Sequence, residues 1–313
     1  MILMKLRIFN QSYKRYDRYY NYFWDYLIYK LSQTHEIKEF RDRSTFHDNS
    51  GIELTQNLED SDFLVLNEEN DKFVIFSICD ILQHHISLFK ENENLSKIFL
   101  SQFYDLNIKA NAEDKYSKFS PWIYFPCFVE NLDQYYLMRK YREDKLKDIL
   151  FFKGTVFDRP ILEKFSKEIL SDYSYCYSPQ EYCKELIGYK VGLSLSGRGE
   201  FCYRDIEYMA MGLPFLRFQF QSEMIYPLIP NYHYISVEIP EDLPQEINRD
   251  NLYLDRMGDR HHAEILENKF LQVKDDSDLL EEISRNARKY YDDYLAPESS
   301  INLTLELIEK ELI

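Results

Sequence analysis

Residues Lys190–Phe218 read KVGLSLSGRGEFCYRDIEYMAMGLPFLRF, and this stretch decides which fold we expect. It begins as an apolar strand that ends in Ser-Gly-Arg-Gly; a helix is predicted over Tyr203–Met211 and a second strand over Pro214–Phe218. Glycines let a backbone approach a ligand closely, and the free N–H groups at a helix N-terminus favour an anion. Strand, glycine loop, helix and strand together form the repeating unit of an α/β fold, which binds ligands at the carboxyl ends of its strands.

Two charged residues of the predicted helix, Arg204 and Glu207, lie three positions apart and therefore share one helix face. An arginine near the helix N-terminus suits a diphosphate, and a glutamate there suits two vicinal ribose hydroxyls. Ser196, Gly197 and Arg198 of the preceding loop complete this candidate site. The same residues also fit a plain strand–loop–helix–strand unit in which Arg204 and Glu207 form a surface ion pair.

A second segment, Ile149–Lys164, reads ILFFKGTVFDRPILEK. Its apolar strand ends in Lys153 and Gly154, and Arg159 stands before a helix predicted to have proline at its first position. A glycine and a basic residue at the end of a buried strand again favour an anion. The alternative is a glycine turn followed by a helix that Asp158 caps.

The order of predicted elements indicates two α/β halves. The first half has apolar strands at 2–9, 62–66, 72–77 and 97–101 and helices at 13–31 and 81–89, and a new alternation begins at Ile149. We place the boundary near Asp148, after the charged helix predicted over 131–147. The expected fold is α/β, with two Rossmann-like domains, residues 1–148 and 149–313, facing across a ligand-binding cleft. The last helix, 299–312, is expected to return toward the N-terminal half.

The pairing of the strand end F-F-K-G and its following arginine with the later S-G-R-G, R-D-I-E and G-L-P strings resembles the donor-binding half of exostosin-type glycosyltransferases. It is similar also to the CAP10-like glucosyl- and xylosyltransferases, whose corresponding strand reads F-x-G-(S/T) with a following arginine. The stretch that begins at Asp276 resembles the closing helices of these families. The resemblance extends from Ile149 to the C-terminus.

This resemblance implies a GT-B fold and metal-independent transfer of a sugar from a nucleotide-sugar donor, with phosphate or nucleotide roles for Arg159, Arg204 and Glu207. We expect an inverting hexosyl- or pentosyltransferase that uses a UDP- or GDP-linked donor, a glycan hydroxyl as acceptor and no cofactor. Residues 1–148 would then form the acceptor side and residues 149–313 the donor side. The alternative is a non-catalytic protein that binds a nucleotide sugar or a glycan on the same scaffold.

An inverting transferase needs a general base that deprotonates the acceptor hydroxyl. Asp80 follows the predicted strand 72–77 at its carboxyl end, where a residue faces the cleft, and we expect it to be this base. Asp80 also fits the N-cap of the next helix. His84 and His85 follow in that helix and fit an ordinary, half-buried helix face as well as catalysis.

We expect no metal site. D-S-D strings occur at 60–62 and 276–278, and transferases of the GT-A type use such a string after an apolar strand to hold a divalent cation. Here the first string begins a predicted strand and the second begins a predicted helix, whose first turn favours carboxylates, so we interpret both as caps. His261 and His262 lie in a predicted polar loop without ligand partners at suitable spacing.

The formal net charge of −16 argues against nucleic acid or an anionic membrane as a partner, because either needs a concentrated basic face. The five cysteines form no C-x-x-C pair and are interpreted as reduced thiols of a cytoplasmic protein. The N-terminal MILMKLRIF is too short to span a membrane, and no later stretch approaches ~20 uninterrupted apolar residues. We therefore expect no integral membrane segment.

Overall fold

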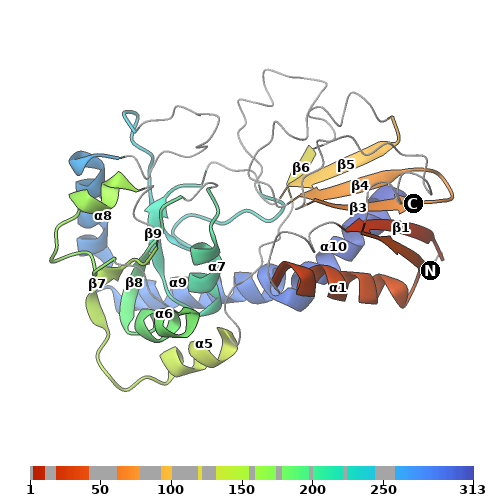
Figure 1. Cartoon of the computed structure of the whole chain (residues 1–313). Coiled ribbons are helices and arrows are strands. Elements are labelled where there is room, and N and C mark those ends of the chain that lie inside the picture. Colours follow the sequence, from red (N-terminus) through yellow and green to blue (C-terminus); the bar gives the residue numbers. More distant parts are fainter. Residues whose placement is uncertain are drawn as a thin grey trace. The chain divides into compact units, whose positions relative to one another are not determined.

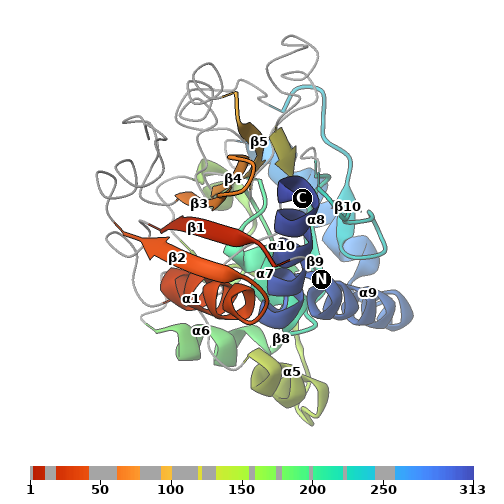
Figure 2. The ribbon, with the colours of Figure 1, turned by 90° about the vertical axis from the view of Figure 1, so that its right-hand side faces the viewer.

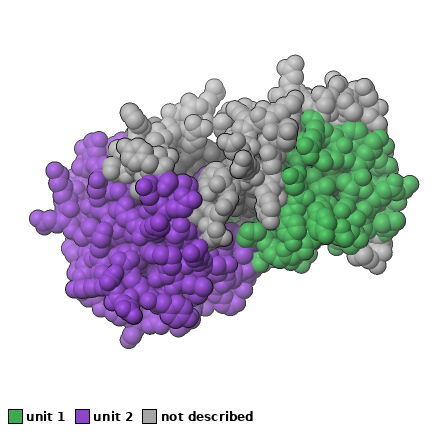
Figure 3. All heavy atoms as spheres, turned by 60° about the horizontal axis from the view of Figure 1, so that its bottom comes forward, with its two compact units in different colours: residues 1–126, 222–226, 297–313 green, residues 127–221, 227–296 purple. Residues whose placement is uncertain are grey.

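The computed structural model describes residues 3–10, 19–41, 62–77, 93–100, 119–121, 132–154, 159–173, 178–196, 200–220, 224–243 and 258–313. The chain forms two compact units, which Figure 3 colours separately. Unit 1 comprises residues 1–126, 222–226 and 297–313, and unit 2 comprises residues 127–221 and 227–296.

Unit 1 contains a six-stranded sheet with the strand order β2-β1-β3-β4-β5-β6. Its strands are β1 (Lys5–Asn10), β2 (Glu36–Phe40), β3 (Asp62–Asn67), β4 (Phe73–Ser77), β5 (Leu95–Leu100) and β6 (Phe119–Pro121). Strand β3 runs antiparallel to both of its neighbours, and all other pairs are parallel. Only five residues join β3 to β4, which suffices for a hairpin but not for the crossover that a parallel pair requires. The hairpin explains why these two successive strands follow each other without a helix between them.

Helices α1 (Tyr19–Ser32) and α10 (Pro297–Leu312) lie side by side, and α10 also contacts β3, β4 and β5 (Figures 1 and 2). The carbonyl of Leu312, at the end of α10, accepts hydrogen bonds from the side-chain amides of Asn67 at 3.0 Å and Asn70 at 2.9 Å. These bonds satisfy one of the carbonyls that a helix end leaves without an intrahelical partner. The last helix thus belongs to the N-terminal unit, as the sequence predicted.

Unit 2 contains a four-stranded parallel sheet with the order β10-β9-β8-β7. Its strands are β7 (Lys147–Phe151), β8 (Tyr189–Leu193), β9 (Phe215–Phe218) and β10 (Ile235–Val237). Its helices are α5 (Leu132–Lys140), the 3₁₀ turn η2 (Pro160–Lys164), α6 (Pro179–Leu186), α7 (Tyr203–Ala210), α8 (Arg260–Val273), α9 (Ser277–Tyr290) and the π-helical turn η4 (Tyr291–Leu295).

Helices cover both faces of this sheet (Figure 1). Leu150, Leu193 and Leu216 share one core cluster with residues of η2 and α8, whereas α6 and α7 lie against the opposite face. At Gly192 of β8 a Cβ atom would lie 2.6 Å from the ring of Tyr208 in α7, so a larger residue would push the helix off the strand. Alternate residues of each strand thus serve opposite layers, as expected of a parallel sheet buried on both faces.

Three sequence-based expectations need correction. The units divide between Pro126 and Cys127 rather than near Asp148, because α5 contacts α7 and β7 pairs with β8. The helix predicted over 131–147 ends at Lys140, since residues from Lys147 onward form β7. The helix predicted from Pro160 to Leu170 is a single 3₁₀ turn, because the backbone around Leu170 bonds to Leu150 of β7.

Candidate active site

The end of β7, the end of β8 and the first turn of α7 come together in unit 2. Arg204 donates two hydrogen bonds to backbone carbonyls: one from Nη2 to the oxygen of Lys153 at 3.1 Å and one from Nη1 to the oxygen of Leu195 at 3.3 Å. Its guanidinium carbon lies 4.1 Å from the centroid of the Phe152 ring, and that of Arg159 lies 5.7 Å from the same centroid. The structure therefore brings two predicted site residues, Arg159 and Arg204, to one aromatic ring, and Arg204 also bonds to the backbone of a third, Lys153.

Gly154 leaves room for the guanidinium of Arg204 in this position. A Cβ atom at position 154 would lie 2.6 Å from Nη2 of Arg204, closer than side chains normally approach. The sequence predicted a glycine that lets a ligand approach the backbone, and the structure gives the glycine a second reason, the close approach of Arg204.

Arg204 has unused hydrogen-bonding capacity at an anion-favouring position. A guanidinium carries five N–H donors, and the Nε of Arg204, a residue that is only 9% exposed, has no hydrogen-bond partner among the residues that the structure describes. A buried donor without a partner is costly, and an anion at the N-terminus of α7 would satisfy it. Glu207 is 8% exposed, so Arg204 and Glu207 do not form the surface ion pair that the sequence left open.

Glu207 lies one helical turn beyond Arg204 on α7. Burial raises the pKa of its carboxyl to about 7, while the Tyr182 hydroxyl and the Arg204 guanidinium oppose this rise. An ionised carboxylate only accepts hydrogen bonds, which suits a ligand that presents hydroxyl groups. Near neutral pH, Glu207 is therefore present both as a carboxylate, which can accept hydrogen bonds from two hydroxyl groups, and as a protonated carboxyl.

We expect binding of a nucleotide sugar to weaken as the pH falls through 7, because protonated Glu207 loses acceptor capacity. If only the ionised form binds, affinity drops about 20-fold between pH 7.5 and 5.5. The stability of the free protein changes in the opposite direction. Because the pKa of Glu207 is higher in the folded than in the unfolded chain, the free energy of unfolding increases as the pH falls from about 7 toward the pKa of the unfolded chain. Calorimetric titration with an intact nucleotide sugar, whose diphosphate does not titrate in this range, measures the first effect. Glu207→Gln should remove the pH dependence, and a dependence that survives would contradict this role.

The remaining predicted residues divide into two groups. Lys153 places Nζ 3.5 Å from Oε2 of Glu185, and Ser196, at the end of β8, is buried. Gly197 and Arg198 lie outside the described residues, so their part in the site stays a prediction. Also outside the described residues are the predicted base Asp80 and its alternatives His84 and His85.

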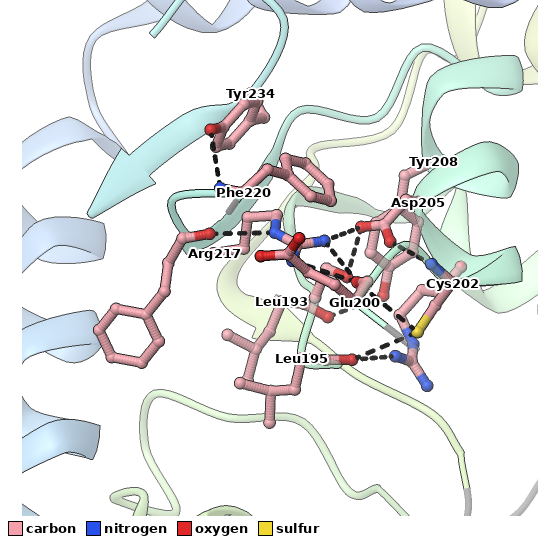
Figure 4. A network of polar contacts seen from close by, with 12 residues as sticks. Leu193, Leu195, Glu200, Cys202, Asp205, Tyr208, Arg217, Phe220 and Tyr234 are labelled. Carbon is pink, nitrogen blue, oxygen red and sulfur yellow. Dashed lines mark hydrogen bonds and ion pairs between the residues drawn. The ribbon is translucent and has the colours of Figure 1, made fainter. Parts of the chain in front are cut away.

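A buried polar network that the sequence reasoning missed lies beside this site (Figure 4). Asp205 of α7 and Arg217 of β9 form an ion pair of 3.1 Å, and both side chains are at most 1% exposed. Oδ1 of Asp205 also accepts a hydrogen bond from the Ser194 hydroxyl at 2.6 Å, and Oδ2 accepts one from the Cys202 N–H at 2.7 Å. Both Nη atoms of Arg217 donate to the carbonyl oxygen of Glu200 at 3.2 Å. The network links β8, β9 and the start of α7.

One signal in the sequence could have revealed this pair. Arg217 is the single charged residue in the buried strand Phe215–Phe218, and a charge in such a strand needs a partner. Asp205 occupies the third position of α7, where a carboxylate can accept from the backbone N–H of the capping residue. Neither signal names the other residue, so the pairing itself emerges only from the folded chain.

Among the described residues no group of three or more His, Cys, Asp or Glu side chains is placed to hold a metal ion. Asp276 caps α9, as predicted, by accepting from the Leu279 N–H at 3.1 Å. The predicted polar loop at His261 and His262 is wrong: both lie in the first turn of α8, and Asp259 caps that helix by accepting from the His262 N–H. Within the described part of the chain, no helix combines the length and the apolar character needed to cross a bilayer.

No protein-family model matches this sequence, and no curated protein sequence does. Among solved structures the chain is similar to WaaG, a glycosyltransferase involved in lipopolysaccharide biosynthesis, at 13% identity and a TM-score of 0.39, covering 72% of this chain and 66% of WaaG. It is similar also to TarM, at 14% identity and a TM-score of 0.36, covering 79% and 64% of the two chains. A glycosyltransferase from Rickettsia africae matches at 13% identity and a TM-score of 0.39, covering 92% and 74%. The chain thus spans about two thirds of the length of WaaG and of TarM.

The α/β class with two parallel-rich sheets is confirmed by the structure. None of the three similar structures is named as an exostosin-type or CAP10-like enzyme, so that resemblance stays a prediction from the sequence.

Proposed function

We propose that this chain is a glycosyltransferase that moves a sugar from a UDP- or GDP-linked donor to the hydroxyl of a glycan, with inversion and without a metal ion. One observation carries the proposal: Arg204 lies buried at the N-terminus of α7, beside the ends of two parallel strands, and one of its donor atoms has no partner in the described part of the chain. The position favours a phosphate group by charge and by hydrogen bonding. Glu207, one turn away, supplies an acceptor for the hydroxyls of a nucleoside.

In the proposed reaction the acceptor oxygen attacks the anomeric carbon while the bond from that carbon to the diphosphate breaks. The leaving nucleoside diphosphate takes the electron pair, and a general base takes the acceptor proton. The two guanidinium groups beside the Phe152 ring, those of Arg204 and Arg159, stabilise the charge that develops on the diphosphate. We propose Asp80 as the base and unit 1, which contains residues 1–126, as the unit that holds the acceptor.

A screen of UDP-, GDP- and CMP-linked sugars by thermal shift tests the donor part of this proposal. A ligand that binds only the folded chain raises its unfolding temperature, and the shift grows with the ratio of concentration to dissociation constant. We expect one nucleotide class to shift the transition and the others to leave it unchanged. Release of nucleoside diphosphate in the presence of glycan acceptors then tests transfer. A chain that binds a donor but never transfers sugar would instead be a binding protein on this scaffold, and a chain that binds none would contradict the proposal.

We also expect turnover to persist in excess EDTA. The cation's usual task, neutralising the leaving diphosphate, falls here to arginine side chains and a helix N-terminus. The measurement compares initial rates before and after the chelator, with Mn²⁺ or Mg²⁺ added back. Loss of activity that either ion restores would revive a metal role for the D-S-D string at 60–62.

A further inference from the structure

We infer that Arg217 is a positioning residue of the proposed donor site, holding Glu200 and the first turn of α7 where a diphosphate would bind. The inference rests on the proposed function and adds a residue that contacts no ligand itself. Arg217 is 1% exposed in β9, and its guanidinium carbon lies 3.3 Å from the centroid of the Phe220 ring. Its Nε donates to the carbonyl of Phe218 at 3.1 Å, and both of its Nη atoms donate to that of Glu200.

The carboxylate of Asp205, which forms the ion pair with Arg217, connects three elements through its two oxygens. Oδ1 of Asp205 accepts from Arg217 in β9 and from Ser194 at the end of β8, and Oδ2 accepts from the N–H of Cys202, the residue that caps α7. Figure 4 shows Asp205 between Arg217 and Cys202. Rotation or withdrawal of Asp205 would therefore release the strand end and the helix start together.

The residues that bond to Asp205 and Arg217 lie on both sides of the proposed site in the sequence. Ser194 precedes Ser196 by two residues, Glu200 follows the predicted glycine loop, and Cys202 precedes Arg204 by two residues. Arg204 in turn bonds to Leu195, which lies between the two serines. The ion pair thus fixes the segments on both sides of the residues that would contact the ligand.

The energetics favour a role in placement over a role in stability. A buried ion pair loses hydration on both partners, and apolar replacements of similar volume are often as stable. Here the pair also makes directed bonds to three backbone groups, Phe218 C=O, Glu200 C=O and Cys202 N–H, which an apolar pair would leave unsatisfied. Such directed bonds set the geometry of Glu200 and of the helix start, as positioning requires.

Arg217→Lys tests the inference, with Arg139→Lys as the matched control. Lysine at 217 keeps a charge for Asp205 but loses the paired donation to Glu200. Arg139 makes a similar fork to backbone carbonyls, those of Tyr189 at 2.6 Å and Gly212 at 3.2 Å, at the opposite end of β8. Isothermal titration with UDP and with GDP, each alone, gives the affinity, and thermal unfolding gives the stability of each variant.

We expect both variants to unfold at a lower temperature than the unmodified chain, and only Arg217→Lys to bind the nucleotide about tenfold more weakly. Equal affinities in the two variants would overturn the positioning role, because a purely structural loss affects both. An unmodified chain that binds neither UDP nor GDP would overturn the proposed function, and this inference with it. If Arg217→Lys does not fold, Ser194→Ala decides: it removes one bond to Asp205, and an unchanged affinity would overturn the inference.

Discussion

Replacing Arg204 with alanine should weaken donor binding by about 100-fold, the largest effect that we expect from any single substitution in unit 2. The estimate comes from losing two charge-assisted hydrogen bonds to a diphosphate, about 1.5 kcal/mol each. The substitution also frees the buried carbonyls of Lys153 and Leu195, so a loss of stability accompanies it. Calorimetric titration with the donor identified in the screen measures the affinity, and thermal unfolding measures the stability.

Two further variants distinguish the loss of the Arg204 charge from the loss of hydrogen bonds to backbone carbonyls. Arg139→Ala likewise frees backbone carbonyls in the same unit, and we expect it to lower stability while donor affinity stays unchanged. Gly154→Ala retains the Arg204 charge but places a Cβ atom 2.6 Å from Nη2, so it should displace the guanidinium and weaken binding. Donor binding that survives both Arg204→Ala and Gly154→Ala would locate the diphosphate elsewhere.

Local sequence patterns predicted most of the fold because its strands are apolar runs and its helices carry glycine, proline or aspartate at their ends. They failed where an element is short or polar. Strand β10 has three residues, too few for a recognisable period, and α8 is rich in charged and polar side chains. The antiparallel insertion of β3 depends on the length of a connection rather than on any apolar pattern.

The sequence indicated which residues to consider for a site but not how they bond to one another. A glycine loop between a strand and a helix predicts an anion site, and in the structure Arg204 of the following helix bonds to Leu195, just beyond the end of β8. The fork from Arg204 to two strand ends joins residues far apart in the sequence, as does the Asp205–Arg217 pair. Spacing along a chain carries no information on such pairs, since they form only when three strands and a helix have packed.

The second large effect concerns the proposed base. Asp80 follows β4 (Phe73–Ser77) by three residues, and it lies outside the described part of the chain. Its role is therefore proposed from the sequence alone.

Asp80→Asn should reduce the rate of transfer by about 10²–10⁴-fold while donor affinity stays unchanged, because removal of a general base affects the chemical step and not the binding of a diphosphate. The substitution discriminates between the two interpretations of Asp80. Asparagine caps a helix about as well as aspartate, so a residue that only caps would tolerate the change with little loss of rate or stability. Single-turnover rates with a saturating donor, together with the donor affinity of the same preparation, measure both quantities. Near-normal rates would reject Asp80 as the base and make His84 or His85 the next residue to replace, whereas loss of donor binding would point to a structural defect instead.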